Sequence, residues 1–278
     1  MIHRRAFIGS GFAFAAMPAW ALSKTDRLVI KGAMEQGSLA LGYAQKGASV
    51  TVDGEKTRLS PDGVFAFGFA FDQTKPSVVM VAWPDGTMET QSYTPTARQY
   101  EIQRVNGLPQ NTVTPPPEVL ERIKKEAAEI YEARRRDTEG ADFLDGFDWP
   151  APGIESGVFG SQRIDNGIPM TPHFGVDMAA PTGTPIHAPA DGTVSLSADH
   201  YLNGGFTLID HGQGVSTSYL HQSKRLVKDG AVVKRGQLIG HIGQTGRATG
   251  PHLHWAMNWF EVKLDPSRST RKPKPDKL

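Results

Sequence analysis

The feature that most constrains the fold of this chain is a succession of short β-prone runs and turn signals. The turn sequences Asp53-Gly54, Pro61-Asp62-Gly63 and Pro84-Asp85-Gly86 recur in the first hundred residues. They follow or precede apolar runs, which lie at 28–30, 48–52, 64–69 and 77–81. Strands spaced about 10 residues apart predict a small antiparallel β-sandwich over residues 24–105, with an immunoglobulin-like arrangement.

A proline run interrupts this pattern and introduces a linker over residues 106–150. Residues 115–117 are all proline, and apolar side chains then recur at near-helical spacing. Acidic Glu118 lies near the start of this stretch and the arginine run 134–136 lies at its end, which complements a helix dipole. We therefore expect a helix over 118–136 inside the linker.

The remainder of the chain is again mainly β in character. Glycine and proline are frequent there and divide a set of short strand candidates. These candidates are 192–194, 206–209, 215–219, 237–242 and 253–257. Residues 151–266 are thus expected to form a second β domain, followed by a basic, proline-rich tail over 267–278 that is expected to be disordered.

The His252-Leu253-His254 triplet is the strongest chemical signal in this second region. Residues two apart on a strand point to the same face, so the two imidazoles would lie side by side while Leu253 enters the core. Imidazole is the commonest metal ligand and also the usual proton carrier near neutral pH. One strand could therefore supply both a ligand and a general acid or base.

A second cluster, His173-Phe174-Gly175-Val176-Asp177, pairs an imidazole with a carboxylate at an even offset. In an extended strand His173 and Asp177 would share a face. Together with one histidine of the later triplet they would give zinc three protein ligands and an open fourth position. Residue reasoning alone does not choose between His252 and His254.

The sequence context of both clusters resembles the M23 peptidases, the LytM or lysostaphin-like zinc endopeptidases that cut cell-wall peptidoglycan. The resemblance covers about Gly153 to Pro266 and rests on motifs in matching order. These motifs are His173-Phe-Gly-Val-Asp177 through Pro185, Ala190-Asp-Gly-Thr-Val194, Thr217-Ser-Tyr-Leu-His221, Val233 to Gly240, and Gly243-Gln-Thr-Gly246 with Gly250-Pro-His-Leu-His-Trp255.

By position, the resemblance implies that His173, Asp177 and His254 bind one Zn²⁺ per chain. It implies that His221 and His252 are the unliganded catalytic histidines, one accepting the proton of the attacking water and the other stabilising the tetrahedral intermediate, in either order. It also implies an antiparallel sheet that carries the site in a groove. The chain has no cysteine, which excludes a thiol nucleophile, and it contains no Gly-x-Ser-x-Gly elbow or His-Glu-x-x-His helix.

The N-terminus resembles an export signal. Arg4-Arg5 precede a short apolar stretch that ends at Ala19-Trp20-Ala21, which predicts a Tat-like signal peptide over 1–21. The apolar run is shorter than the roughly 20 residues needed to span a bilayer, so no stable membrane span is expected. These features predict a periplasmic or cell-envelope protein.

The expected function is hydrolysis of peptide cross-links in peptidoglycan, with peptide stems as the substrate and an activator protein as a possible partner. In a two-membrane bacterium the bond would involve D-alanine and diaminopimelate. The formal net charge of +1 gives no reason to expect nucleic acid as a partner. The alternative is a catalytically silent LytM-like regulator that activates other wall hydrolases; retention of all five site positions argues against it.

Overall fold

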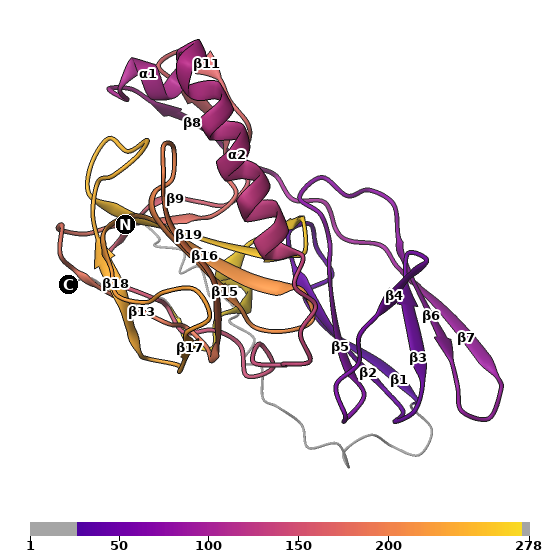
Figure 1. Cartoon of the computed structure of the whole chain (residues 1–278). Coiled ribbons are helices and arrows are strands. Elements are labelled where there is room, and N and C mark those ends of the chain that lie inside the picture. The colour runs from indigo at the N-terminus through magenta and orange to yellow at the C-terminus, as the bar shows by residue number, and fades with distance from the viewer. Residues whose placement is uncertain (1–26, 274–278) are drawn as a thin grey trace, which may run out of the picture.

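The structure is a computed structural model that describes residues 27–273. Its first seven strands form two antiparallel sheets beside the rest of the molecule (Figure 1). One sheet contains β1 (Leu28–Gly32), β2 (Leu39–Ala44) and β5 (Val64–Gly68). The other contains β3 (Ser49–Val52), β4 (Glu55–Thr57), β6 (Ser77–Ala82) and β7 (Met88–Tyr93).

The two sheets share one apolar core. Phe65 and Phe67 of β5 and Phe69 just after it are fully buried, and they belong to the same cluster as Val50 and Val79 of the facing sheet. The expected sandwich is therefore present, and its core is rich in aromatic side chains. The immunoglobulin-like strand order stays a prediction.

The second region is built on a ten-stranded sheet, in agreement with the mainly β prediction. Its central path runs β17-β14-β15-β16-β19-β12-β9 with antiparallel pairing throughout, while β13, β18 and β20 attach beside it. The ten strands are β9 (Ile154–Gly157), β12 (Val176–Ala179), β13 (Pro185–His187), β14 (Gly192–His200), β15 (Gly204–Asp210), β16 (Val215–Arg225), β17 (Val232–Val233), β18 (Leu238–Ile242), β19 (His252–Trp259) and β20 (Val262–Leu264).

A third, three-stranded sheet corrects the expected domain boundary at residue 105. Strand β8 (Ile102–Val105) was assigned to the N-terminal sandwich, but it pairs in parallel with β10 (Gln162–Asp165), which also pairs with β11 (Ile168–Pro169). The pairing joins residues about sixty apart in sequence, which no local pattern predicts. Residues 102–105 therefore belong structurally with the second region.

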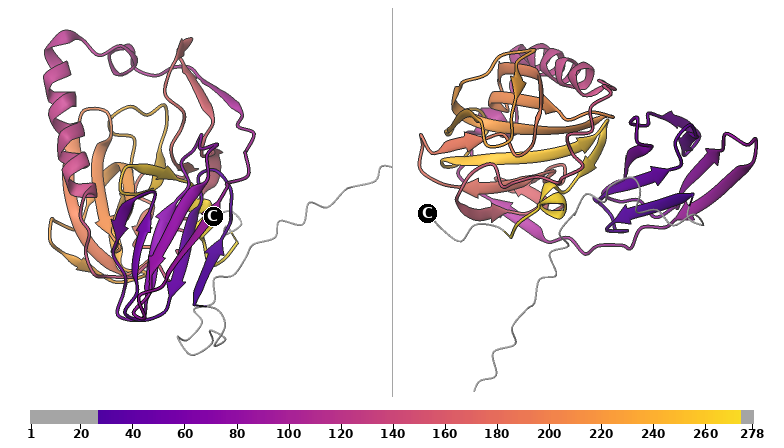
Figure 2. Two further views of the ribbon diagram at one scale, coloured as in Figure 1. Left: turned by 90° about the vertical axis from the view of Figure 1, so that its right-hand side faces the viewer. Right: turned by 90° about the horizontal axis from the view of Figure 1, so that it is seen from below.

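Helix α2 (Pro117–Arg134) lies close to the predicted range of 118–136 and leans across the outside of the ten-stranded sheet (Figures 1 and 2). Pro116 and Pro117 start it, because proline fits the first helical turn without losing a hydrogen bond. Ile130 is buried against Leu196, Phe206 and Leu208 of β14 and β15. A short helix α1 (Gln110–Val113) precedes it.

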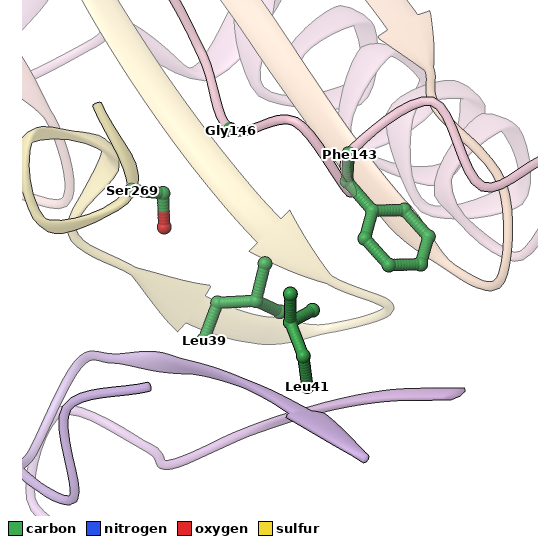
Figure 3. A pocket seen from close by; sticks show the side chains of 5 residues that line it. All are labelled: Leu39, Leu41, Phe143, Gly146 and Ser269. Carbon is green, nitrogen blue, oxygen red and sulfur yellow. The ribbon is translucent and has the colours of Figure 1, made fainter. Parts of the chain in front are cut away.

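The N-terminal sheets and the second region are joined by a continuous apolar core. Leu39 and Leu41 of β2 belong to the same buried cluster as Phe143, Phe147 and Leu264. Figure 3 shows the two leucines facing Phe143 across a small pocket at this junction. The Arg98–Asp265 ion pair, with an Nη2–Oδ2 distance of 2.9 Å, adds a polar link between the two regions.

The expected disordered tail is wrong for its first residues. Pro266–Ser269 form a turn of 3-10 helix in which the Asp265 carboxylate accepts from the Ser267 backbone. Arg271 then pairs bidentately with Asp148. Buried contacts thus override the basic, proline-rich composition up to this point, while 274–278 and the predicted signal peptide at 1–21 lie outside the described residues. Across residues 27–273, the longest helices are too polar or too short to cross a bilayer.

Candidate metal centre and active site

Three donor atoms converge where β12 and β19 lie side by side. Asp177 on β12 is directly opposite His254 on β19, and His173 lies in the loop that leads into β12. His173 Nε2 is 3.0 Å from Asp177 Oδ1 and 2.9 Å from His254 Nδ1, and the last two atoms are 2.8 Å apart. Among the described residues these three side chains form the group whose geometry suits a metal ion.

The backbone around His173 is firmly held. Its N–H donates to the Ser161 carbonyl at 2.8 Å, and its own carbonyl accepts from the Gly160 N–H at 2.7 Å. The ring Nδ1 faces the Val158 carbonyl at 3.1 Å and donates to it, which leaves a lone pair on Nε2 of the neutral ring. His173 Nε2 and the Asp177 carboxylate then face each other as two acceptors.

A cation between these acceptors resolves that conflict, and the donor set fits zinc. Two imidazole nitrogens and one carboxylate oxygen at bond lengths of about 2.0–2.1 Å would be separated by about 3.3 Å in a tetrahedral site, a few tenths of an ångström more than observed. Burial lowers the pKa of His254 to about 4, so its ring is neutral at neutral pH. For Asp177, burial raises the pKa, but the two adjacent imidazoles hold it well below its usual range. Neutral imidazoles and an ionised carboxylate are the forms that bind a metal.

His221 and His252 form a second pair beside the three donors. Their ring centroids are 4.7 Å apart, and His252 Nε2 is 3.9 Å from Asp177 Oδ1. In each ring Nδ1 donates to a backbone carbonyl, from His221 to Thr245 at 2.8 Å and from His252 to Gly250 at 2.9 Å. Each ring, when neutral, therefore keeps an unprotonated Nε2. Burial lowers the pKa of His221 to about 3, with His252 and His254 adding to the effect.

The backbone of His221 explains how its ring is turned toward the site. Its φ of 63° lies in the left-handed region, which a non-glycine residue adopts at a cost of about 1–3 kcal/mol. The pairing of β16 with β15 and with β18 shifts register close to this residue, and the His221 N–H donates to the Asn203 carbonyl at 2.8 Å. The bulge thus breaks the strand alternation where the ring is needed.

Two glycines leave the space that the donors occupy. A Cβ on Gly175 would lie 2.5 Å from His254 Nε2 and 2.8 Å from the backbone oxygen of Trp255. A Cβ on Gly157 would lie directly against Asp177 Oδ2. Any side chain at these positions would displace a donor.

Comparison with known proteins agrees with this geometry. Residues 171–266 match the family described as Peptidase family M23. These residues form a domain of this family. It is 49% identical over 88 residues to the peptidoglycan DD-endopeptidase ShyA of Vibrio cholerae (32% of this chain, 20% of the relative), and 45% identical over 83 residues to the DD-carboxypeptidase/endopeptidase Mpg of Neisseria meningitidis (30% and 19%). The chain thus spans about a fifth of the length of these curated relatives.

A solved structure extends the likeness beyond the M23 match. The structure of a putative peptidase M23 from Pseudomonas aeruginosa superposes with a TM-score of 0.65 at 29% identity, covering 84% of this chain and 94% of that chain. The likeness therefore includes most of the residues that precede the M23 domain.

Two further histidines of the M23 domain, His211 and His200, contact residues outside the site. His211 is fully buried: its Nδ1 donates to the Asp191 carbonyl and its Nε2 accepts from the Thr217 hydroxyl at 2.7 Å. Burial lowers the pKa of His211 to about 4. His200 Nε2 lies 3.4 Å from Glu129 of α2, in a helix-to-sheet contact.

Sequence reasoning brought together the five histidine and aspartate positions but missed the residues that hold them. Arg163 Nη2 contacts Asp177 Oδ2 at 2.5 Å, and Thr245 orients His221 through its carbonyl. A single arginine in a short polar strand, such as Arg163, does not stand out in the sequence. The role of Thr245 depends on its backbone carbonyl, which the pattern of side chains does not reveal. Gly175 was visible inside the His173–Asp177 motif, where its lack of a side chain was the available clue.

Proposed function

We propose that this M23-domain protein is a zinc metalloendopeptidase that hydrolyses peptide cross-links of bacterial peptidoglycan. The observation that carries the proposal is the convergence of His173 Nε2, Asp177 Oδ1 and His254 Nδ1 beside two imidazoles that each present a free Nε2. These three side chains would hold one zinc ion, and His221 and His252 would be the catalytic residues. Bound zinc would supply Lewis acidity that polarises a carbonyl and acidifies a water molecule.

The two free imidazoles supply the proton transfers that peptide hydrolysis needs. As water oxygen bonds to the carbonyl carbon, the Nε2 lone pair of one ring accepts the water proton. The same proton can then pass to the leaving nitrogen as the carbon–nitrogen bond breaks, which restores the neutral ring. The second ring, when protonated on Nε2, donates a hydrogen bond to the oxyanion that develops on the carbonyl oxygen.

The fixed orientation of both rings supports these roles. Each Nδ1–H is committed to a backbone carbonyl, so proton exchange is restricted to Nε2. The low pKa of His221 keeps that ring neutral at neutral pH, so its Nε2 lone pair is not already occupied by a proton. The His221 ring is further fixed because its backbone, which has a left-handed φ, is held by the bulge and by the hydrogen bond to Asn203.

The substrate and compartment are proposed from the relatives and the N-terminal sequence. ShyA is named a peptidoglycan DD-endopeptidase and Mpg a DD-carboxypeptidase/endopeptidase, so a cross-link between D-alanine and diaminopimelate is the proposed bond. Such a substrate lies outside the cytoplasm, which matches the Tat-like residues at 1–21. Replacing Arg4 and Arg5 by lysine should retain the protein in the cytoplasm; unchanged export would contradict a twin-arginine signal.

Incubation with purified sacculi tests the proposal. The wild-type chain should convert cross-linked muropeptide dimers into monomers, a chelator should stop the reaction, and added zinc should restore it. His221→Ala is the matched inactive control. Separation of whole peptides from glycan would indicate an amidase and contradict the proposed bond. Release that occurs only with a second hydrolase present would instead indicate the regulator class.

A further inference from the structure

The second oxygen of the Asp177 carboxylate has a partner of its own. While Oδ1 faces His173 and His254, Oδ2 accepts from Arg163 Nη2 at 2.5 Å. The two side chains are 18% and 7% exposed, so the ion pair is largely shielded from water. The carboxylate is thus divided between a cation site on one side and a guanidinium on the other.

Strand β10 carries this guanidinium in a fixed place. Its backbone is paired on both edges, with β8 on one side and β11 on the other. At its two ends the Gln162 N–H donates to the Glu101 carbonyl and the Asn166 N–H to the Val105 carbonyl, both at 2.8 Å. A side chain on a strand with both edges paired is held more precisely than one on a loop.

The next residue on the same side of β10 also faces a guanidinium, at a longer distance and without a hydrogen bond. Asp165 lies two positions from Arg163, is fully buried, and has Arg247 Nη1 4.0 Å from its Oδ2. Arg247 belongs to the loop that carries Thr245, the hydrogen-bond partner of His221. Strand β10 therefore contacts the cation site through Arg163 and the catalytic loop through Asp165.

The contacts of Arg163 indicate that its role is directed at Asp177. Its Nε is buried and has no hydrogen-bond partner among the described residues. The hydrogen bond that this side chain makes runs from Nη2 to Asp177 Oδ2. The position of the guanidinium thus allows the hydrogen bond from Nη2 to Oδ2 but leaves Nε without an acceptor.

We propose that Arg163 is a positioning residue that occupies Oδ2 of Asp177, so that Oδ1 alone faces the metal. Carboxylates can bind metal ions through one oxygen or both, and an unrestrained Asp177 could rotate about its terminal bond. The arginine restricts that rotation and fixes the one-oxygen arrangement. This inference rests on the proposed zinc site, because it assigns the residue that orients one of the ligands.

Zinc affinity in the full-length Arg163→Gln variant tests the proposal. We expect the dissociation constant, measured by chelator competition, to rise about 10- to 100-fold, as is typical when a hydrogen-bond partner of a metal ligand is lost. In the cobalt-substituted variant, visible absorption should fall in intensity as the second carboxylate oxygen joins the coordination sphere. Neither change follows from a loss of stability alone.

Arg98→Gln is the matched control. Arg98 and Asp265 form an ion pair with similar exposure, 17% and 4%, at the junction with the N-terminal sheets. This variant should lose thermal stability while zinc affinity and the cobalt spectrum stay as in wild type. Equal zinc affinity in wild type and Arg163→Gln would overturn the positioning role.

Arg163→Lys keeps the test decisive if Arg163→Gln fails to fold. Lysine keeps the positive charge but lacks the planar guanidinium that fixes the direction of the hydrogen bond. The zinc affinity of Arg163→Lys should therefore be several-fold weaker than that of wild type and stronger than that of any folded Arg163→Gln protein. Wild-type affinity in Arg163→Lys, with Arg163→Gln unfolded, would assign Arg163 to stability and overturn the inference. Absence of bound zinc in wild type would instead contradict the proposed function itself.

Discussion

Gly175→Ala is the substitution whose effect on the metal site can be worked out most directly. The new methyl carbon would lie 2.5 Å from His254 Nε2, 2.6 Å from its Cε1 and 2.8 Å from the Trp255 backbone oxygen. Ordinary contact requires at least about 3.4 Å, so the ring or the loop must move by about 0.9 Å. The backbone of β19 is paired on both sides and cannot move easily, so the His254 ring would be displaced.

A displacement of that size exceeds the tolerance of a zinc site, where bond lengths vary by about 0.2 Å. We expect zinc affinity to fall about 100-fold or more, and the crowding to cost about 1–3 kcal/mol of folding stability. Chelator competition measures the first and chemical denaturation of the metal-free protein the second. Gly250→Ala is the control, since a Cβ there meets open space. Wild-type zinc affinity in Gly175→Ala would refute the reasoning.

Two further predictions concern histidines with lowered pKa values. His221→Ala should retain zinc but lose about 10²- to 10⁴-fold in hydrolysis of sacculi, since it removes a proton acceptor and no metal donor; retained cutting would remove its assigned role. The pKa of His211 is about 4 in the folded state, against 6.5 for an unperturbed histidine in an unfolded chain, so the unfolded state binds more protons between these pH values. Stability should therefore fall by about 3 kcal/mol as pH drops from 7 to 4, and His211→Gln should lack this part of the slope in urea titrations at several pH values. Parallel pH profiles for the two proteins would contradict this.

Much of the fold followed from local patterns, and the exceptions have physical causes. The runs at 28–30, 48–52, 64–69 and 77–81 correspond to β1, β3, β5 and β6. Strand β2 was missed because it is buried along most of its length and shows no alternation, and because Gly42 replaces a side chain where the Phe65 ring packs. Strand β7 was missed because its polar sequence carries little β signal.

In the site, too, features set by neighbouring residues were predictable from the sequence, while features set by distant strands were not. Even spacing placed His252 and His254 on one face of β19, with Leu253 fully buried behind them, as the triplet predicts. The left-handed backbone of His221 depends on a bulge between three strands, which no single segment encodes. The contact of Arg163 depends on a strand pair between distant parts of the chain and was equally out of reach.

The most direct test of the account is the zinc content of the purified full-length protein, measured by elemental analysis in wild type and in His254→Ala. Three donors from two segments should hold about one zinc per chain in wild type, and removal of the His254 nitrogen should bring the content close to zero. Zinc content that is the same in both proteins would contradict the assignment of the metal site and the hydrolytic function built on it.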